Sequence, residues 1–434
     1  MAGQNATSPA APSPASTAPA GGTAADRADV LVIGGGVIGL AVAWRAAQRG
    51  LQVIVADPAP GTGATHAAAG MLTPVAEAAY AERELFALGS ESLARYPAFT
   101  AELTRLTGLP TGFRQTGTLQ VAYDSDDLAV LVEAHRLQQS FGRAATRLTG
   151  REVRAAEPLL DPSVRGGLLA EGDGSVDPRL LARALLAAVR QAGVAVISQA
   201  AVQISTASAG GRGDRVAGAR LADGTEIRAP QVVLAAGWQS AAIAGLPPGA
   251  VPPVRPVKGQ ILRLRPPPAA GTTGPGTSGA AGTRAAALAA AAAAPPALLA
   301  RTVRGIVRGS SVYLVPREDG ELVVGATQEE LGADTTVTAG GVWELLRDAR
   351  LIVPGITELE LAEAVAGLRP GTPDNAPVLG PGMLPGLALA TGHFRGGVLL
   401  APVTADVLAE FLETERLPVL AAPFTAQRFA TARA

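Results

Sequence analysis

Apolar runs and helical repeats alternate along this chain, a pattern typical of proteins that mix helices with buried strands. Residues 29–35 (DVLVIGG) form an apolar, β-branched run, which predicts a strand buried on both faces. Residues 37–50 have helical apolar spacing and end at Gly50, and residues 51–57 (LQVIVAD) predict a second buried strand. This order predicts a βαβ unit and therefore a parallel sheet.

The same patterns predict the remaining elements. Residues 58–75 are rich in Gly and Ala and predict a loop that runs into a helix. We expect helices over 81–108, 126–142, 178–193, 341–352 and 397–412, strands over 117–123, 194–198, 231–237, 259–265, 310–317, 320–327 and 387–392, and a hairpin turn at Asp223–Gly224. Two stretches lack any such pattern, and we expect residues 1–28 to be a disordered tail and residues 266–300 a low-complexity, disordered surface insertion.

Composition narrows the function classes. Lys and Arg number 36 against 37 for Asp and Glu, so charge gives no attraction to nucleic acid or to a membrane surface. There is no cysteine, which excludes disulfides, thiolate metal sites and a cysteine-tethered flavin, and the 3 histidines argue against a metal site. Residues 1–28 lack the parts of a secretory signal, and residues 285–294 are too short to span a bilayer, so we expect a cytoplasmic protein.

The first predicted strand and helix are joined by the pattern G-x-G-x-x-G, formed by Gly34, Gly36 and Gly39. The three glycines allow a tight turn, a close approach of a pyrophosphate to the backbone, and close packing of helix on strand. The positive end of the helix dipole then faces the phosphates. Asp57 ends the second strand, where a carboxylate accepts hydrogen bonds from ribose hydroxyls and repels a 2′-phosphate. The segment therefore predicts a site for NAD or FAD.

Residues farther along the chain carry a resemblance to a known family. The Gly- and Ala-rich segment 61–72 resembles the flavin-contacting loop of the D-amino-acid oxidase and glycine oxidase superfamily. Segments 311–317, 366–381 and 391–400 are similar to the matching parts of the glycine oxidases of thiamine biosynthesis. The resemblance covers nearly all of residues 29–415.

This resemblance implies an α/β fold with two domains. One is an FAD-binding Rossmann-like domain of the glutathione-reductase type, and the other is an antiparallel-sheet α+β substrate domain. The implied boundaries are 29–80, 150–245 and 362–425 for the FAD-binding domain, and 81–149 and 246–361 for the substrate domain.

The resemblance also implies which residues bind the substrate. Tyr313 and Arg369 hold the substrate carboxylate, and Arg395 joins them as a substrate-binding and catalytic residue. A guanidinium suits this task because its planar fork meets a carboxylate with two hydrogen bonds. Arg369 lies between Pro and Gly residues, which predicts a loop. Lys258 matches a basic position of the family.

For the cofactor, the resemblance implies FAD held without a covalent bond. Members of the family usually have Glu at the end of the second strand, where this chain has Asp57. The resemblance also implies that the backbone of Val202 packs against the adenine. His393 contacts or positions the flavin. The complete set of implied FAD contacts is Gly34, Gly36, Val37, Ile38, Gly39, Asp57, Pro58, Ala64, Thr65, Ala69, Gly70, Met71, Val202, Gly237, His393, Phe394, Arg395, Gly396, Gly397, Val398 and Leu399.

The implied reaction is the oxidative deamination of glycine, and also of small amines and D-amino acids. Hydride passes from Cα to flavin N5, the imine hydrolyses to glyoxylate or enters thiazole assembly for thiamine, and dioxygen becomes hydrogen peroxide. Glycine or another small amino acid and O2 are the expected partners, and the family often forms homo-oligomers, including tetramers.

Several alternatives stay open at this point. A sarcosine oxidase and a D-amino-acid dehydrogenase belong to the same superfamily, although the absence of cysteine argues against a covalently tethered sarcosine oxidase. An NAD-dependent dehydrogenase would not need the segment Gly392–Gly397 to return to the cofactor. A flavin-stabilised assembly factor would bind FAD but would not react with any amine.

Overall fold

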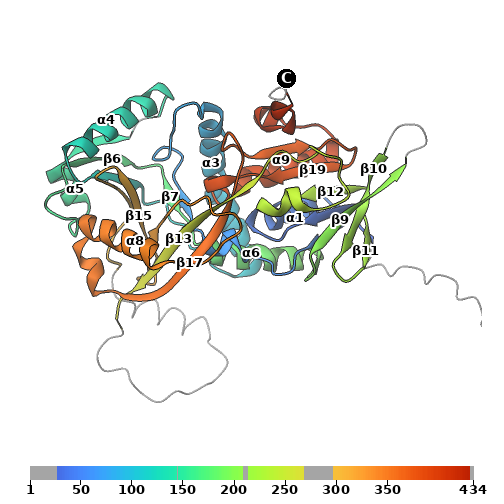
Figure 1. Ribbon diagram of the computed structural model, residues 1–434, viewed down its shortest axis with the longest axis horizontal. Coiled ribbons are helices and arrows are strands. Elements are labelled where there is room, and N and C mark those ends of the chain that lie inside the picture. Colours follow the sequence, from blue (N-terminus) through green and yellow to red (C-terminus); the bar gives the residue numbers. More distant parts are fainter. Residues whose placement is uncertain (1–26, 144, 209–213, 268–296, 431–434) are drawn as a thin grey trace, which may run out of the picture.

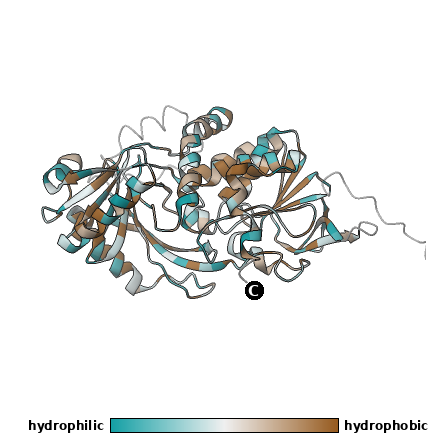
Figure 2. Ribbon diagram, turned by 90° about the horizontal axis from the view of Figure 1, so that it is seen from above, coloured by the Kyte–Doolittle hydropathy of each residue, from teal (hydrophilic) through white to brown (hydrophobic). Residues whose placement is uncertain are grey.

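Two large sheets organise the chain, one in each lobe of the molecule (Figure 1). The computed structural model describes residues 27–143, 145–208, 214–267 and 297–430. Apolar residues concentrate in the strands and in the central helices, whereas the outer helices carry more hydrophilic residues (Figure 2). This mixed α/β architecture confirms the predicted fold class.

The first lobe contains a six-stranded sheet in the order β18-β19-β12-β1-β2-β8. Five neighbouring strands are parallel and β18 runs antiparallel at the edge. The bounds are β1 Val30–Ile33, β2 Val53–Ala56, β8 Ala195–Ile197, β12 Gln231–Leu234, β18 Val378–Pro381 and β19 Leu387–Thr391. Every residue of β1 and β2 is buried, as expected for strands covered on both faces.

Successive residues of β1 point to opposite layers. Val30 and Val32 pack with the helices, whereas Leu31 and Ile33 pack with a second, three-stranded sheet. The helices are α1 Val37–Gln48, α3 Arg83–Thr107, α6 Pro178–Gln191 and α9 Ala401–Thr414, and the small sheet is β9 Ala201–Ser208, β10 Asp214–Leu221 and β11 Glu226–Arg228. The turn at Asp223–Gly224 joins β10 to β11, which confirms the predicted hairpin.

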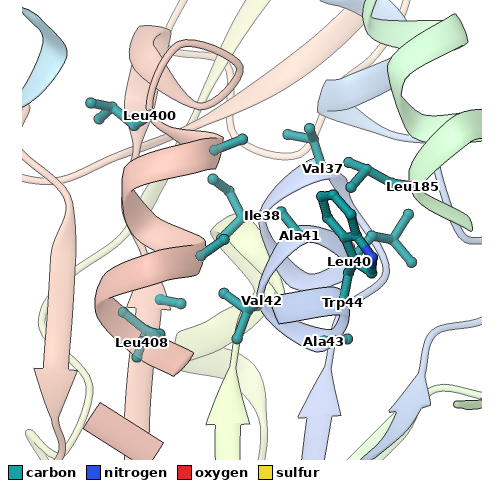
Figure 3. Close-up of a cluster of buried hydrophobic side chains, with 14 of the residues drawn as sticks. Val37, Ile38, Leu40, Ala41, Val42, Ala43, Trp44, Leu185, Leu400 and Leu408 are labelled. Carbon is teal, nitrogen blue, oxygen red and sulfur yellow. The ribbon is translucent and has the colours of Figure 1, made fainter. Parts of the chain in front are cut away.

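Helix α1 is buried at the centre of this lobe. Figure 3 shows Ile38 and Val42 on the side of α1 that faces α9, which carries Leu408 and begins after its N-cap residue Leu400. Leu185 of α6 lies on the other side of α1. A helix that is apolar on so much of its surface needs neighbours all round it. The position of α1 is therefore fixed by packing, which holds its N-terminus at the end of β1.

The second lobe contains an eight-stranded sheet in the order β17-β13-β16-β15-β14-β4-β6-β5. Neighbours are antiparallel except for the parallel pair β14 and β4. The bounds are β4 Thr118–Ala122, β5 Thr146–Thr149, β6 Gly166–Ala170, β13 Arg255–Arg265, β14 Thr302–Val307, β15 Ser310–Pro316, β16 Leu322–Gly325 and β17 Glu360–Gly371. Strands β13 and β17 lie side by side and reach toward the first lobe (Figure 1).

Helix α8 Ala339–Ile352 covers one face of this sheet, where Leu345 and Ile352 join Leu262 and Leu314 in one apolar cluster. Helices α4 Ser125–Ser140 and α5 Gly150–Ala156 pack farther along the sheet. The opposite face carries a cluster to which Ala69 contributes from the first part of the chain. This second face therefore meets the segment that follows the nucleotide-binding motif.

Short elements complete the chain. They are α2 Ala64–Ala67, the paired strands β3 Met71–Leu72 and β7 Gly174–Ser175, and the 3-10 helices η2 Gly237–Ala242, η3 Pro354–Glu358, η4 Phe394–Gly396, η5 Val419–Phe424 and η6 Ala426–Phe429. Among the described residues, no helix has the length and apolar character that a membrane span requires.

Three sequence predictions need correction. The last long helix begins at Ala401 instead of residue 397, because the chain first makes the 3-10 turn η4 and Pro402 then starts the helix. Ala28, predicted to lie in the tail, is buried and donates its amide to the Arg228 carbonyl at 3.0 Å. Leu299, predicted to lie in the insertion, is also fully buried. The rest of the tail and most of the insertion lie outside the described residues.

Candidate active site

Residues predicted to hold the cofactor gather at one edge of the six-stranded sheet. Gly34 follows β1, Asp57 follows β2, Gly237 follows β12 and His393 follows β19. These four strands are parallel, so their carboxyl ends share an edge. Open α/β sheets bind their ligands at this edge.

The N-terminus of α1 is open to an anion. Its N-cap residue is Gly36, no side chain of the N-cap bonds to the helix, and the first turn has no acidic residue. A Cβ on Gly36 would lie 3.4 Å from the Thr65 hydroxyl, which accepts the Val37 amide at 3.1 Å. Small groups and backbone amides at a positive dipole end fit a diphosphate.

The turn before α1 depends on two glycines that have no room for a side chain. A Cβ on Gly39 would lie 1.8 Å from the Gly34 carbonyl oxygen, and a Cβ on Gly34 would lie 2.4 Å from the Ala235 oxygen. Gly34 also has φ +108°, in the region that favours glycine. The motif therefore brings α1 close to β1, as predicted, and also brings β1 close to the residues that follow β12.

Asp57 is locked in place beside this turn. Its Oδ2 accepts the Gly35 amide at 2.6 Å and its Oδ1 accepts the Ala59 amide at 2.7 Å. A carboxylate has further lone pairs on both oxygens, so it still has acceptor capacity for ribose hydroxyls. The turn, the open helix end and this acid fit a dinucleotide such as FAD.

The segment after α2 links the cofactor edge to the second lobe. Ala69 and Met71 pack on Ile261 and Tyr313 of the eight-stranded sheet. Gly70 has φ +75°, and a Cβ there would lie 2.0 Å from the Val176 oxygen. The predicted flavin-contacting loop therefore lies against the face that carries Tyr313.

The structure brings Arg369 and Tyr313 together over two strand glycines. A Cβ on Gly259 of β13 would lie 2.3 Å from Nη2 of Arg369, and a Cβ on Gly325 of β16 would lie 2.4 Å from the Tyr313 hydroxyl. The two side chains therefore converge from β17 and β15 across the strands between them. Sequence analysis missed both glycines, although a glycine inside a strand signals a close approach of another group.

Arg369 carries a positive charge that no carboxylate of the described chain meets. Its Nη1 donates to the carbonyls of Lys258 at 3.3 Å and Thr327 at 3.2 Å. The predicted loop position of Arg369 is wrong, because Arg369 lies in β17 opposite Val257. The adjacent Pro370 misled the prediction, and proline is tolerated here because β17 is an edge strand.

Tyr313 is suited to donate a hydrogen bond. Burial raises the pKa of its phenol, and the positive charge of Arg369 opposes that shift without cancelling it. The hydroxyl therefore keeps its proton at neutral pH. Tyr313 and Arg369 together offer a hydroxyl donor and a guanidinium whose charge no carboxylate of the described residues neutralises, an arrangement that suits a carboxylate ligand.

Arg395 lies at a neighbouring cavity and is already paired. Its guanidinium donates to the Glu82 carboxylate, and its side chain is 30% exposed. The cavity is lined by residues that include Glu77, Glu82, His393 and Arg395. The structure thus gives Arg395 a compensated charge, unlike Arg369.

His393 is buried beneath this cavity. Its Nε2 lies 3.1 Å from the Thr404 hydroxyl, and burial lowers the pKa of the imidazole to about 3. The ring is therefore neutral at physiological pH and is only a weak base. This environment agrees with a positioning role.

The His393→Gln variant should lose less stability in acid than the wild type. The folded pKa lies below the unfolded value, so the unfolded chain binds the proton first as pH falls. The stability due to the neutral ring is fully present above pH 6.5 and declines below it, by about 2 kcal/mol between pH 6.5 and 4.5. Denaturant unfolding of both proteins at several pH values measures the difference, and parallel pH profiles would contradict it.

Other predicted contact residues have identified neighbours. The Val398 carbonyl accepts the Tyr96 hydroxyl at 2.5 Å and the Leu399 carbonyl accepts the Ser92 hydroxyl at 2.6 Å, so α3 holds this segment. The Val202 carbonyl accepts the Ala244 amide at 3.1 Å, and Val202 as a whole is 40% exposed.

Lys258 has a role that its sequence position did not reveal. It is fully buried, and its Nζ lies 2.5 Å from Asp334 and 3.4 Å from Glu329. Its carbonyl also accepts from Arg369. Lys258 therefore ties the segment after β16 to the strand beneath Arg369.

Comparisons with known proteins identify the family of the chain. The family model described as FAD dependent oxidoreductase matches residues 29–411. A bifunctional protein ThiO/ThiG of Trichormus variabilis is 33% identical over 92% of this chain and 55% of its own length. The chain thus spans about half the length of that relative.

A second relative is similar over its whole length. The glycine oxidase of Geobacillus kaustophilus is 32% identical over 93% of this chain and 97% of its own length. A crystal structure of glycine oxidase from that organism matches with a TM-score of 0.78 and 31% identity, covering 93% of this chain and 99% of the other. The chain belongs to the family of FAD dependent oxidoreductases.

Proposed function

We propose that this protein oxidises the C–N bond of a small amino acid, with glycine as the main substrate. The observation that carries the proposal is the convergence of the uncompensated Arg369 guanidinium and the Tyr313 hydroxyl. That pair lies on the sheet face against which Ala69 and Met71 pack. Similarity to proteins named glycine oxidase supports the same substrate class.

The charge of the site favours a substrate with one carboxylate. Arg369 provides one unmet positive charge, whereas Arg395 is compensated by Glu82. The carboxylate accepts from the Arg369 fork and from the Tyr313 hydroxyl, which fixes the position of Cα. Burial disfavours the ammonium form, so the amine loses its proton on binding.

FAD, when bound, would supply a hydride acceptor for the Cα hydrogen and a route for the two electrons to dioxygen, which is thereby reduced to hydrogen peroxide. Its diphosphate would lie at the α1 N-terminus beside Gly36 and Thr65, and its ribose at Asp57. The imine product hydrolyses to glyoxylate and ammonia or supplies the thiazole of thiamine. Two domains with the boundaries given above, and a homo-oligomer, complete the proposal.

Anaerobic reduction tests this function directly. The purified protein should be yellow, lose its visible flavin band when glycine is added without air, and regain it with peroxide formation when air returns. A yellow protein that bleaches faster with sarcosine or D-alanine would keep the oxidase assignment and change the substrate. A protein that remains colourless after FAD is added would contradict the proposal.

A further inference from the structure

A second arginine lies on the same sheet face as the proposed carboxylate site. Arg304 of β14 is directly opposite Tyr313 of β15. Directly opposite residues of paired strands share one face. Tyr313 therefore has Arg304 on one side, and on the other side it converges with Arg369 over Gly325.

Arg304 differs from Arg369 because a carboxylate meets its charge. Its Nη1 lies 2.6 Å from Oε1 of Glu77 and 3.8 Å from the Met71 sulfur. The Arg304 and Glu77 side chains are 19% and 18% exposed. Both charges also act on the Tyr313 phenol, whose pKa Glu77 raises and Arg304 lowers, after the larger effects of burial and Arg369. The ion pair is therefore part of the surroundings of the substrate carboxylate.

The backbone around Glu77 is held by buried hydrogen bonds. The Glu77 amide donates to the Thr73 carbonyl at 2.9 Å. Asp173, which is fully buried, accepts the Ala76 amide at 3.2 Å, and Gln120 donates to the Ala76 carbonyl at 3.0 Å. A carboxylate on so constrained a backbone is held against Arg304 before any substrate arrives.

We propose that Glu77 occupies the place of a second substrate carboxylate and thereby restricts the enzyme to amines with a single carboxylate. Arg304 is then a latent anchor that a dicarboxylic amine would use if Glu77 were absent. This inference rests on the proposed function, since it assigns the substrate class of the same site. Glu77 also lines the cavity beside Arg395, so removal of its charge leaves the Arg304 guanidinium next to that cavity without its carboxylate partner.

Two pairs of substrates separate this effect from a general change in activity. Sarcosine and iminodiacetate differ by a carboxylate on the nitrogen substituent, and D-alanine and D-aspartate differ by a carboxylate on Cβ. The Glu77→Gln variant keeps the side-chain shape and removes the charge. We expect the ratio of kcat/KM for the dicarboxylic over the monocarboxylic member to rise at least about tenfold in one of the pairs, as for a new charge-assisted contact.

A double variant identifies the anchor. In Glu77→Gln with Arg304→Met, the gain should disappear, because the guanidinium that binds the second carboxylate is gone. A gain that persists in the double variant would overturn the assignment to Arg304. Unchanged ratios in both substrate pairs for Glu77→Gln would overturn the role of Glu77. If Glu77→Gln does not fold, the same measurements are made on Glu77→Ala.

Ligand binding tests the inference without turnover. Acetate and malonate, titrated into the oxidised holoenzyme, report their affinities through the flavin absorption spectrum. Malonate should gain at least about tenfold over acetate in Glu77→Gln and lose the gain in the double variant. If no amine reduces the flavin of the wild-type holoenzyme, the proposed function is contradicted. If the wild type oxidises an amine but Glu77→Gln has the same substrate selectivity as the wild type, only this inference is contradicted.

Discussion

Arg369→Ala should lower kcat/KM for glycine by about 100-fold to 1,000-fold, the loss expected when one partner of a buried charge pair is removed. The substrate is small, so its carboxylate supplies most of the binding energy and also the orientation of Cα. FAD should stay bound, because the residues proposed to hold its diphosphate and ribose are Gly36, Thr65 and Asp57, and their hydrogen bonds do not involve Arg369. Steady-state kinetics and the flavin spectrum measure both effects, and retained glycine turnover would show that the carboxylate binds elsewhere.

Gly259→Ala provides an independent test that keeps the arginine. The new Cβ would lie 2.3 Å from Nη2 of Arg369, so the guanidinium must move from its place beside Tyr313. We expect a higher KM for glycine with FAD still bound. Gly340→Ala is the matched control, because a Cβ at Gly340 meets no atom within 4 Å.

Gly39→Ala should have the largest effect on the folded protein. Its Cβ would lie 1.8 Å from the Gly34 carbonyl oxygen, and neither backbone can retreat, because α1 is packed between α9 and α6. Overpacking of a buried backbone contact costs at least about 3 kcal/mol. We expect a lower midpoint of thermal unfolding and loss of FAD, measured by calorimetry and by the flavin-to-protein absorbance ratio.

Gly36→Ala separates packing from cofactor binding. A Cβ at Gly36 would lie 3.4 Å from the Thr65 hydroxyl, nearly an ordinary contact, so the apoprotein should fold normally. The methyl group would instead narrow the approach to the α1 N-terminus and weaken FAD binding. Equal stability losses in Gly39→Ala and Gly36→Ala would contradict this distinction.

Local signals in the sequence were enough to predict the βαβ unit. The strands β1 and β2 are apolar runs, and the motif glycines at the end of β1 and the start of α1 have steric roles that can be stated from spacing alone. The pairing of Tyr313 with Arg369 came from a family resemblance and not from periodicity. Its geometry depends on the register between β13 and β17, which no local pattern reports.

Other parts of the site could not be predicted because they depend on contacts distant in sequence. Nothing near Arg304 indicates that Glu77 compensates its charge, since the two residues meet only in the folded chain. The loop predicted at Arg369 shows the opposite error. Pro370 indicated the end of a strand, but β17 is an edge strand, where a proline need not remove a hydrogen bond from the sheet.

The order of strands in the parallel sheet also sets when the protein can acquire its cofactor. Val30 of β1 pairs with Gln231 of β12, and β12 in turn pairs with β19, which begins at Leu387. Most of the chain must therefore have emerged from the ribosome before the sheet edge that we propose for FAD binding can form. Until β19 is available, one edge of β12 is unpaired and can pair with a strand of another chain, which favours aggregation. Slow release of the last segment, or a shortage of FAD during synthesis, should thus reduce the yield of folded protein more than its specific activity.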